Sequence, residues 1–158
     1  MTDKGPLTWT IADVEGETVV TFSGMLDERS NLAALPPLLG AVTFDLAQVS
    51  RVTSGGVTLW IRFIEELAVT QLSFARCSIP VVNQMNMVRG FRGRAVVRSF
   101  FAPYLCQETD EELQVLLRPE EISPTGTAPV RESTQGTLTL ADLPARYFAF
   151  ILRDGHRA

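Results

Sequence analysis

VTFDLAQVSRVTSGGVTLWIRFIEEL, residues 42–67, carries the clearest structural pattern in the chain. It overlaps a short apolar run, AVTFDLA at 41–47, whose β-branched and aromatic residues favour a buried strand. Two glycines, Gly55 and Gly56, then precede a periodic apolar stretch. A strand, a glycine-containing turn and a helix N-terminus together often hold an anion or present a reactive side chain. This turn therefore either binds a phosphate, carries one covalently, or does neither.

The residues after the turn have the periodicity of an amphipathic helix. Apolar residues recur at spacings of three and four, and charged residues fall outside that stripe. Arg62 and Glu66 are four residues apart and can pair along the exposed side. The pattern predicts a helix that lies on a sheet. The apolar residues expected to face the sheet are Val57, Trp60, Ile61, Ile64, Leu67 and Ala68.

Strands and helices are expected to alternate on both sides of this segment. Residues 7–14 and 17–26 have the pattern of a β-hairpin. A helix at 28–39 would be ended or distorted in its second half by Pro36 and Pro37. This alternation predicts an α/β fold with a mixed, mostly parallel sheet and right-handed crossovers. The further elements expected are a strand at 71–77, a short helix at 80–88 and a strand within 95–105.

The composition changes after Cys106. The segment QETDEE is acidic, and ELQVLLR has the pattern of a strand. Residues 119–137 are rich in Pro, Gly, Ser and Thr, which predicts a long loop or linker. Apolar residues return in LTLADLPARYFAFILR, and its aromatic side chains need burial. We therefore expect a first unit at 1–106 and a small β-rich extension at 107–158 that packs against it.

Composition and charge argue against several classes of protein. The 158 residues are 46% apolar and 20% charged, which is ordinary for a globular protein of one domain with a modest appendage. The net charge of −4 argues against general binding of nucleic acid or anionic membranes. No stretch approaches the roughly 20 apolar residues of a membrane span, and the N-terminal segment lacks the apolar core of a signal peptide. With only Cys77 and Cys106 as thiols, these features predict a cytoplasmic protein.

Two segments resemble the STAS domain, the fold of bacterial anti-sigma-factor antagonists and of sulfate-transporter cytoplasmic tails. These segments are FSGMLDE at 22–28 and the stretch at 42–67. In that family a strand of the type vvlDLs leads to an Asp-Ser-Ser-Gly-Leu turn and a helix. Here Asp45-Leu46 is similar to the strand end, and Thr53–Val57 is similar to the turn. The resemblance implies a STAS-like fold for 1–106 and a protein partner, either an anti-sigma or kinase-like protein or a scaffold component.

The turn departs from the family pattern where phosphorylation would occur. The family's phosphoacceptor Ser or Thr immediately precedes the helix-leading glycine, and that position is Gly55 here, which has no hydroxyl. The family's Asp at the start of the turn is Thr53 here. We expect Thr53 or Ser54 to cap the helix and the turn to bind its partner without phosphorylation at the usual position. The expected partner-binding residues are Thr53, Ser54, Gly55, Gly56, Val57 and Arg62.

Two alternatives for this turn stay open. One is a phospho-switched anti-anti-sigma factor that uses Ser54 or Thr53 as the acceptor. The other is a small-ligand or nucleotide sensor that uses the helix N-terminus to attract an anion. An enzyme is not expected, because the single histidine, His156, lies three residues from the C-terminus and no nucleophile–base set can be assembled from it.

The C-terminal tail resembles a zinc-ribbon-like hairpin that has lost its metal ligands. In similar proteins Pro-Tyr-x-Cys-x-x-Cys and a later Cys-Pro-x-Cys-Gly precede Asp-Asp-x-Pro-x-x-Tyr-Phe-Ala-Phe. Here PYLCQET keeps Cys106 but has Thr109 at the second cysteine position, and APVRESTQG contains no cysteine. The segment ADLPARYFAF is retained. Because structural zinc takes about four nitrogen or sulfur ligands, we expect no metal and no other cofactor.

Arginines are concentrated in MVRGFRGRAVVR, residues 87–98. Arginine beside an aromatic residue such as Phe91 can grip a nucleic-acid backbone and stack on a base. The same residues can dock an acidic protein or be solvated, and the acidic chain favours these two explanations over nucleic acid. A homo-oligomer stays open. The candidate anion or partner contacts in this segment are Arg89, Arg92 and Arg94.

Overall fold

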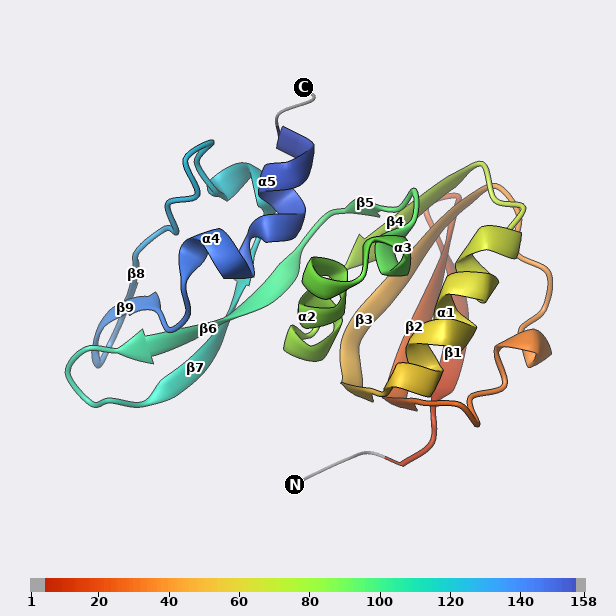
Figure 1. Cartoon of the computed structure of the whole chain (residues 1–158), viewed down its shortest axis with the longest axis horizontal. Helices are drawn as coiled ribbons and strands as arrows, with labels where there is room; N and C mark the ends of the chain where they lie inside the picture. The colour runs from red at the N-terminus through yellow and green to blue at the C-terminus, as the bar shows by residue number, and fades with distance from the viewer. Residues whose placement is uncertain (1–4, 156–158) are drawn as a thin grey trace.

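The computed structural model describes residues 5–155 as two sheets that lie side by side (Figure 1). No helix within that range is both long and apolar enough to cross a membrane. The strands are β1 Thr8–Val14, β2 Glu17–Leu26, β3 Ala41–Val52, β4 Gln71–Ala75, β5 Val96–Val97, β6 Phe100–Cys106, β7 Glu112–Leu117, β8 Arg131–Ser133 and β9 Gly136–Leu140. The helices are η1 Leu32–Ala34, α1 Ser54–Glu66, α2 Ile79–Met87, α3 Arg89–Arg92, η2 Pro119–Glu121, α4 Pro144–Tyr147 and α5 Ala149–Gly155, of which η1 and η2 are 3-10 turns.

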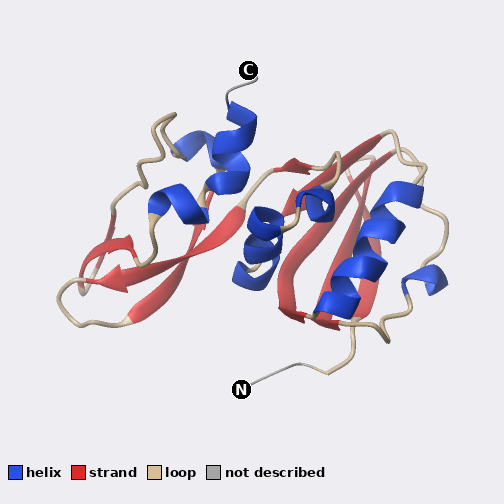
Figure 2. Ribbon diagram, viewed as in Figure 1, coloured by secondary structure: helices blue, strands red, loops and turns tan. Residues whose placement is uncertain are grey.

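The first sheet has the strand order β1-β2-β3-β4-β5. β1 and β2 form the predicted antiparallel hairpin, which turns through Glu15 and Gly16 at φ values of 52° and 83°. β2, β3, β4 and β5 pair in parallel, which confirms a mixed sheet in which parallel pairing dominates. Helices α1, α2 and α3 lie on one face of this sheet (Figure 2). The chain is therefore an α/β protein with a second, antiparallel sheet of order β7-β6-β9-β8.

Trp60 lies at the centre of the first core. It is 2% exposed, and its ring centroid lies 5.6 Å from that of Phe22 on β2 and 5.5 Å from that of Phe91 on α3. Its indole N–H donates a hydrogen bond of 3.0 Å to the Phe91 carbonyl. Large aromatic rings dominate the energetics of a core. Trp60 therefore holds the arginine-rich segment against α1. It also holds α1 against the sheet, as the apolar periodicity predicts, although Ala68, expected on the same face, is exposed and lies beyond the end of α1.

α2 joins the two sheets. Its Val82 and Met85 side chains are buried in the core, and the helix packs on β3 and on β6. The Asn86 side chain faces the C-terminal segment, where its amide N–H donates to the Tyr147 carbonyl at 2.9 Å and its amide oxygen accepts from the Phe150 N–H at 2.9 Å. The aromatic tail is thereby buried, as its composition predicts.

The tail packs on the second sheet through a small aromatic cluster. The ring of Phe100 on β6 lies 5.2 Å from that of Phe150 and 6.1 Å from that of Phe148. The Tyr147 hydroxyl donates to the Phe101 carbonyl. These contacts complete the part of the core that lies between the second sheet and α2.

β3 is longer than its sequence indicated. It continues past the expected end at residue 47 as far as Val52, and its second half pairs with β2 from Ser23↔Gln48 to Leu26↔Val52. The pairing with β4 stops at Asp45. The extension forms because one neighbouring strand supplies enough backbone partners after the other has ended. β3 therefore runs directly into the turn at Thr53.

Other expectations were wrong in their boundaries. The helix expected at 28–39 is reduced to η1. Pro36 and Pro37 have no backbone N–H to donate to a helix, and the residues before η1 form a loop. The strand expected within 95–105 is split into β5 in the first sheet and β6 in the second. The two sheets therefore separate at 98–99, ahead of Cys106. The loop expected at 119–137 contains η2 and β8.

Replacing Asn86 with Ala is expected to lower the free energy of unfolding by about 2–4 kcal/mol, because two partly buried backbone groups lose their partners. Urea unfolding measures this as a lower midpoint at an unchanged m-value. Asn83→Ala, on an exposed position of the same helix, is the control and should stay within about 0.5 kcal/mol of the wild type. Equal effects of the two substitutions would contradict the bridging role of Asn86.

Candidate functional site

The turn between β3 and α1 is closed by Thr53. This residue has an extended backbone, with φ −95° and ψ 168°, and its hydroxyl oxygen accepts from the Gly56 N–H at 3.1 Å. Its own N–H donates to the Leu26 carbonyl at the end of β2 at 3.0 Å. Thr53 is therefore the helix cap, one of the two residues expected for that role. The cap also ties the start of α1 to the neighbouring strand.

Gly56 allows the first turn of α1 to lie directly on the end of β2. A Cβ atom at this position would lie 2.2 Å from the Leu26 carbonyl oxygen and 2.9 Å from the Asp27 nitrogen. Gly56 is buried and thus shapes the turn rather than its exposed surface. A Cβ atom on Gly55 would lie 2.8 Å from the Glu28 Cβ and 2.9 Å from a Glu28 carboxylate oxygen. Any side chain at position 55 must therefore displace Glu28.

Ser54, Thr58 and Arg62 form an exposed row along α1 at four-residue spacing. Val57, also expected as a contact, is half-buried and packs against the core. The sequence reasoning missed Thr58, although its spacing from Ser54 was a usable signal. It also missed Glu28, whose carboxylate accepts from the Thr53 hydroxyl at 3.5 Å. This second contact depends on the position of the β2–η1 loop and has no local signal.

The β2–η1 loop is held beside the turn by Asp27. Asp27 is 6% exposed. Its carboxylate accepts from the backbone N–H of Arg29 at 3.0 Å, and the backbone N–H of Asp27 donates to the Ser30 hydroxyl at 3.0 Å. Such local bonds fix a loop without regular structure. A cavity of about 450 Å³ lies beside this loop and gives the surface a concave part. Its lining includes Leu7, Trp9, Met25, Asp27, Arg29 and Asn31.

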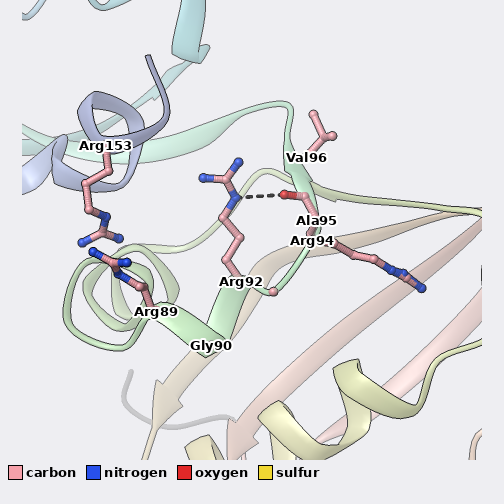
Figure 3. Close-up of a pocket in the computed structure, with 8 residues that line it drawn as sticks. Arg89, Gly90, Arg92, Arg94, Ala95, Val96 and Arg153 are labelled. Carbon is pink, nitrogen blue, oxygen red and sulfur yellow. Dashed lines mark hydrogen bonds between the residues drawn. The ribbon is translucent and has the colours of Figure 1, made fainter. Parts of the chain in front are cut away.

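Of the three arginines expected to act together, Arg94 directs its guanidinium away from the other two (Figure 3). Arg89 and Arg92 line a cavity of about 670 Å³ that Arg153 of α5 also lines. The Arg94 guanidinium donates to the Leu67 and Val69 carbonyls at 3.1 and 3.0 Å, and it points away from Arg89 and Arg92 (Figure 3). Arg153 was missed because it follows Arg92 by many residues and only the packing of α5 brings it here.

The turn after β6 and the β8–β9 turn lie against each other. In the turn after β6, the Asp110 N–H donates to the Cys106 carbonyl at 2.9 Å. Glu108 from this turn accepts from the Thr137 N–H at 3.0 Å, and the Cys106 Sγ lies 3.7 Å from the Gln135 carbonyl oxygen in the β8–β9 turn. Hydrogen bonds thus join the two turns. Within residues 5–155, no group of three or more His, Cys, Asp or Glu side chains is placed to hold a metal ion.

The two thiols differ in their environment. Burial raises the pKa of Cys77, so this thiol stays protonated at neutral pH and packs as an apolar group. The hydrogen bond with the Thr109 side chain lowers the pKa of Cys106. Burial likewise raises the pKa of Tyr147, whose hydroxyl serves the fold through Phe101. His156 lies outside the described residues.

Neither comparison with known proteins assigns a family. A scan of the chain against models of protein families finds no match, and a search of curated proteins finds none. What the geometry defines is a mixed α/β protein with a glycine-containing helix N-terminus built on the end of β2. A separate arginine-lined cavity lies where the first sheet's helices meet the C-terminal segment.

Gly56→Ala is expected to destabilise the protein by about 2 kcal/mol or more, because the new methyl group collides with the backbone of β2 and cannot be relieved by a side-chain rotation. Gly90→Ala is the matched control, since its Cβ would meet Ile61 at 3.5 Å, an ordinary contact. The control should be neutral or stabilising by up to about 1 kcal/mol, because alanine favours the helix. Thermal denaturation measures both. A Gly56→Ala protein as stable as the control would refute the close approach of α1 to β2.

Proposed function

We propose that this chain is a non-catalytic, STAS-like protein that acts by binding another protein in bacterial regulation or scaffolding. Residues 1–106 would form the STAS-like unit and 107–158 its extension. The binding surface would be the turn surface, which we define as Glu28, Ser54, Gly55, Thr58 and Arg62. The observation that carries the proposal is the exposed row Ser54, Thr58 and Arg62 on α1. The start of this helix is held against β2, and Glu28 of the β2–η1 loop lies beside it.

The fixed backbone of the turn suits it to bind a protein partner. Its backbone is fixed by the Thr53 cap, by the bond from Thr53 to Leu26 and by the contact of Gly56 with β2. A surface already held in its bound shape loses little conformational entropy on association. The exposed groups are hydroxyls, one carboxylate and one guanidinium, which suit the polar part of a protein interface. The neighbouring cavity beside Asp27 can receive a projecting side chain of the partner.

The surroundings of Gly55 support a constitutive interaction. Position 55 is where the STAS resemblance would place a phosphoacceptor, and Gly55 has no hydroxyl. The site a side chain would occupy lies against the Glu28 carboxylate. A phosphate there would meet a like charge at close range, which is unfavourable. The position thus suits close packing of the turn on Glu28 better than a phosphorylation switch.

The exposure of Ser54 favours one form of the phospho-switch alternative. Ser54 is exposed and is the first residue of α1, where a phosphate is stabilised by the helix N-terminus. The Thr53 hydroxyl is engaged as the helix cap. If the protein is phosphorylated at this turn, Ser54 is the acceptor we expect.

Ser54→Asp is expected to weaken binding of the partner. The fold should be unharmed, because an acidic residue at a helix start is favourable. Immobilised wild-type protein and variants would be exposed to lysate of the source organism, and bound proteins quantified by mass spectrometry. We expect a specific protein to bind wild type and to bind Ser54→Asp about tenfold less, a loss near 1.4 kcal/mol. Gln114→Asp, exposed on β7, adds the same charge elsewhere and should retain the partner. Retention by Ser54→Asp would move the interface away from α1.

Incubation of the wild type with ATP and an anti-sigma-type kinase is expected to leave Thr53 and Ser54 unmodified, because position 55 carries no hydroxyl. Intact-mass spectrometry measures the outcome. The control is Ser54→Ala, whose own mass should likewise not change on incubation. Stoichiometric addition of one phosphate to wild type, absent from Ser54→Ala, would establish the phospho-switch in place of the constitutive interaction.

A further inference from the structure

A cavity lined by arginines lies between α3, the segment after it and α5 (Figure 3). We call it the arginine pocket and define it by Arg89, Arg92 and Arg153. Its volume of about 670 Å³ falls within the range of small-molecule sites, roughly 300–1,000 Å³. Arg94 also borders the cavity, but its guanidinium points away. The other lining residues are Gly90, Gly93, Ala95 and Val96.

Two of the three arginines are held in place by backbone carbonyls. Arg153 donates to the Met85 carbonyl at 2.9 Å and to the Asn86 carbonyl at 3.3 Å, at the end of α2. Arg92 donates to the Ala95 carbonyl at 2.8 Å and to the Phe150 carbonyl at 3.3 Å. A guanidinium has five N–H donors, so its two bonds to the end of α2 fix Arg153 without using all of its donors. The positive charge is thus presented at little cost in side-chain entropy.

Arg89 completes the pocket from α3. Its side chain is exposed, and it makes no hydrogen bond or ion pair with any residue that the structure describes. Its guanidinium and that of Arg153 point toward one another (Figure 3). None of the described lining residues is acidic. Like charges that converge repel each other, and a multivalent anion between them would turn this repulsion into attraction.

We propose that the arginine pocket binds a small phosphate-bearing molecule. Guanidinium groups match phosphate oxygens through paired, charge-assisted hydrogen bonds, which are stronger than those between neutral groups. Several such groups around one cavity select an anion that carries more than one charge. The volume leaves room for a molecule larger than phosphate itself. The shared chemistry of the ligand is therefore a di- or polyphosphate group on a small body.

This inference is independent of the proposed protein interaction. The turn surface begins at the first residue of α1, whereas α3 contacts the middle of that helix at Ile61. No residue belongs to both sites. Loss of a protein partner in Ser54→Asp and loss of phosphate binding in an Arg89 variant can therefore be observed separately.

The test is isothermal titration calorimetry, in which the heat of binding is measured as sodium pyrophosphate is added to the full chain at constant ionic strength. We expect saturable binding of one pyrophosphate per chain. Arg89→Gln should weaken this binding about tenfold or more, since it removes a charge-assisted contact of at least about 1.4 kcal/mol. Arg89 is exposed and makes no hydrogen bond or ion pair with any described residue, so we expect the variant to keep the melting temperature of the wild type, which verifies that it is folded. Arg29→Gln, which removes another exposed arginine, one on the β2–η1 loop that lies 3.5 Å from the Asp27 carboxylate, should bind as wild type does.

A parallel titration with citrate separates phosphate recognition from general attraction of anions. The proposal expects pyrophosphate to bind at least tenfold tighter than citrate. Equal binding of citrate would overturn the assignment of phosphate as the ligand chemistry. Absence of pyrophosphate binding by wild type, or equal weakening by Arg29→Gln, would overturn the site itself.

Discussion

α2 packs against both sheets within one continuous core, and the rest of the structure depends on this constraint. One side of the helix places Val82 and Met85 in the common core, while the Asn86 amide pairs with the backbone of the C-terminal segment. A side-chain amide that both donates and accepts can replace two backbone partners in a short, irregular segment. The bridge fixes α5 against α2, and Arg153 then reaches the carbonyls at the end of α2. The arginine pocket is therefore a consequence of how the two sheets are joined.

A second constraint is the close contact between α1 and the end of β2. The absence of a side chain at Gly56 allows the helix start to lie on the Leu26 carbonyl, and the length of β3 delivers Thr53 to the same carbonyl. β2, the Thr53 cap and α1 therefore meet at the Leu26 carbonyl. This contact fixes the position of the exposed row that begins at Ser54. The turn surface and the arginine pocket both involve elements packed on α1, so the Trp60 core supports both sites.

Hydrogen bonds join the two facing turns of the C-terminal hairpins. Glu108 accepts from the Thr137 N–H, and the Cys106 Sγ lies beside the Gln135 carbonyl oxygen. Each hydrogen bond contributes only about 1 kcal/mol to the free energy of unfolding, so this extension needs further support. The aromatic cluster around Phe100 and the contact with α2 supply it. The second sheet is therefore stabilised by packing on the rest of the chain.

The sequence by itself determined the features that depend on neighbouring residues. Alternation and turn residues predicted the β1–β2 hairpin, helical periodicity predicted α1, and hydroxyl residues before the glycines predicted a cap at Thr53 or Ser54. Only the tertiary structure decided the length of β3, the division of 95–105 between two sheets and the meeting of Arg89 with Arg153. These features depend on which strand or helix lies alongside, and contacts between residues distant in the chain have no local signal. For the same reason the sequence did not show that Glu28 lies beside Thr53, or that the Arg94 guanidinium bonds to the Val69 carbonyl.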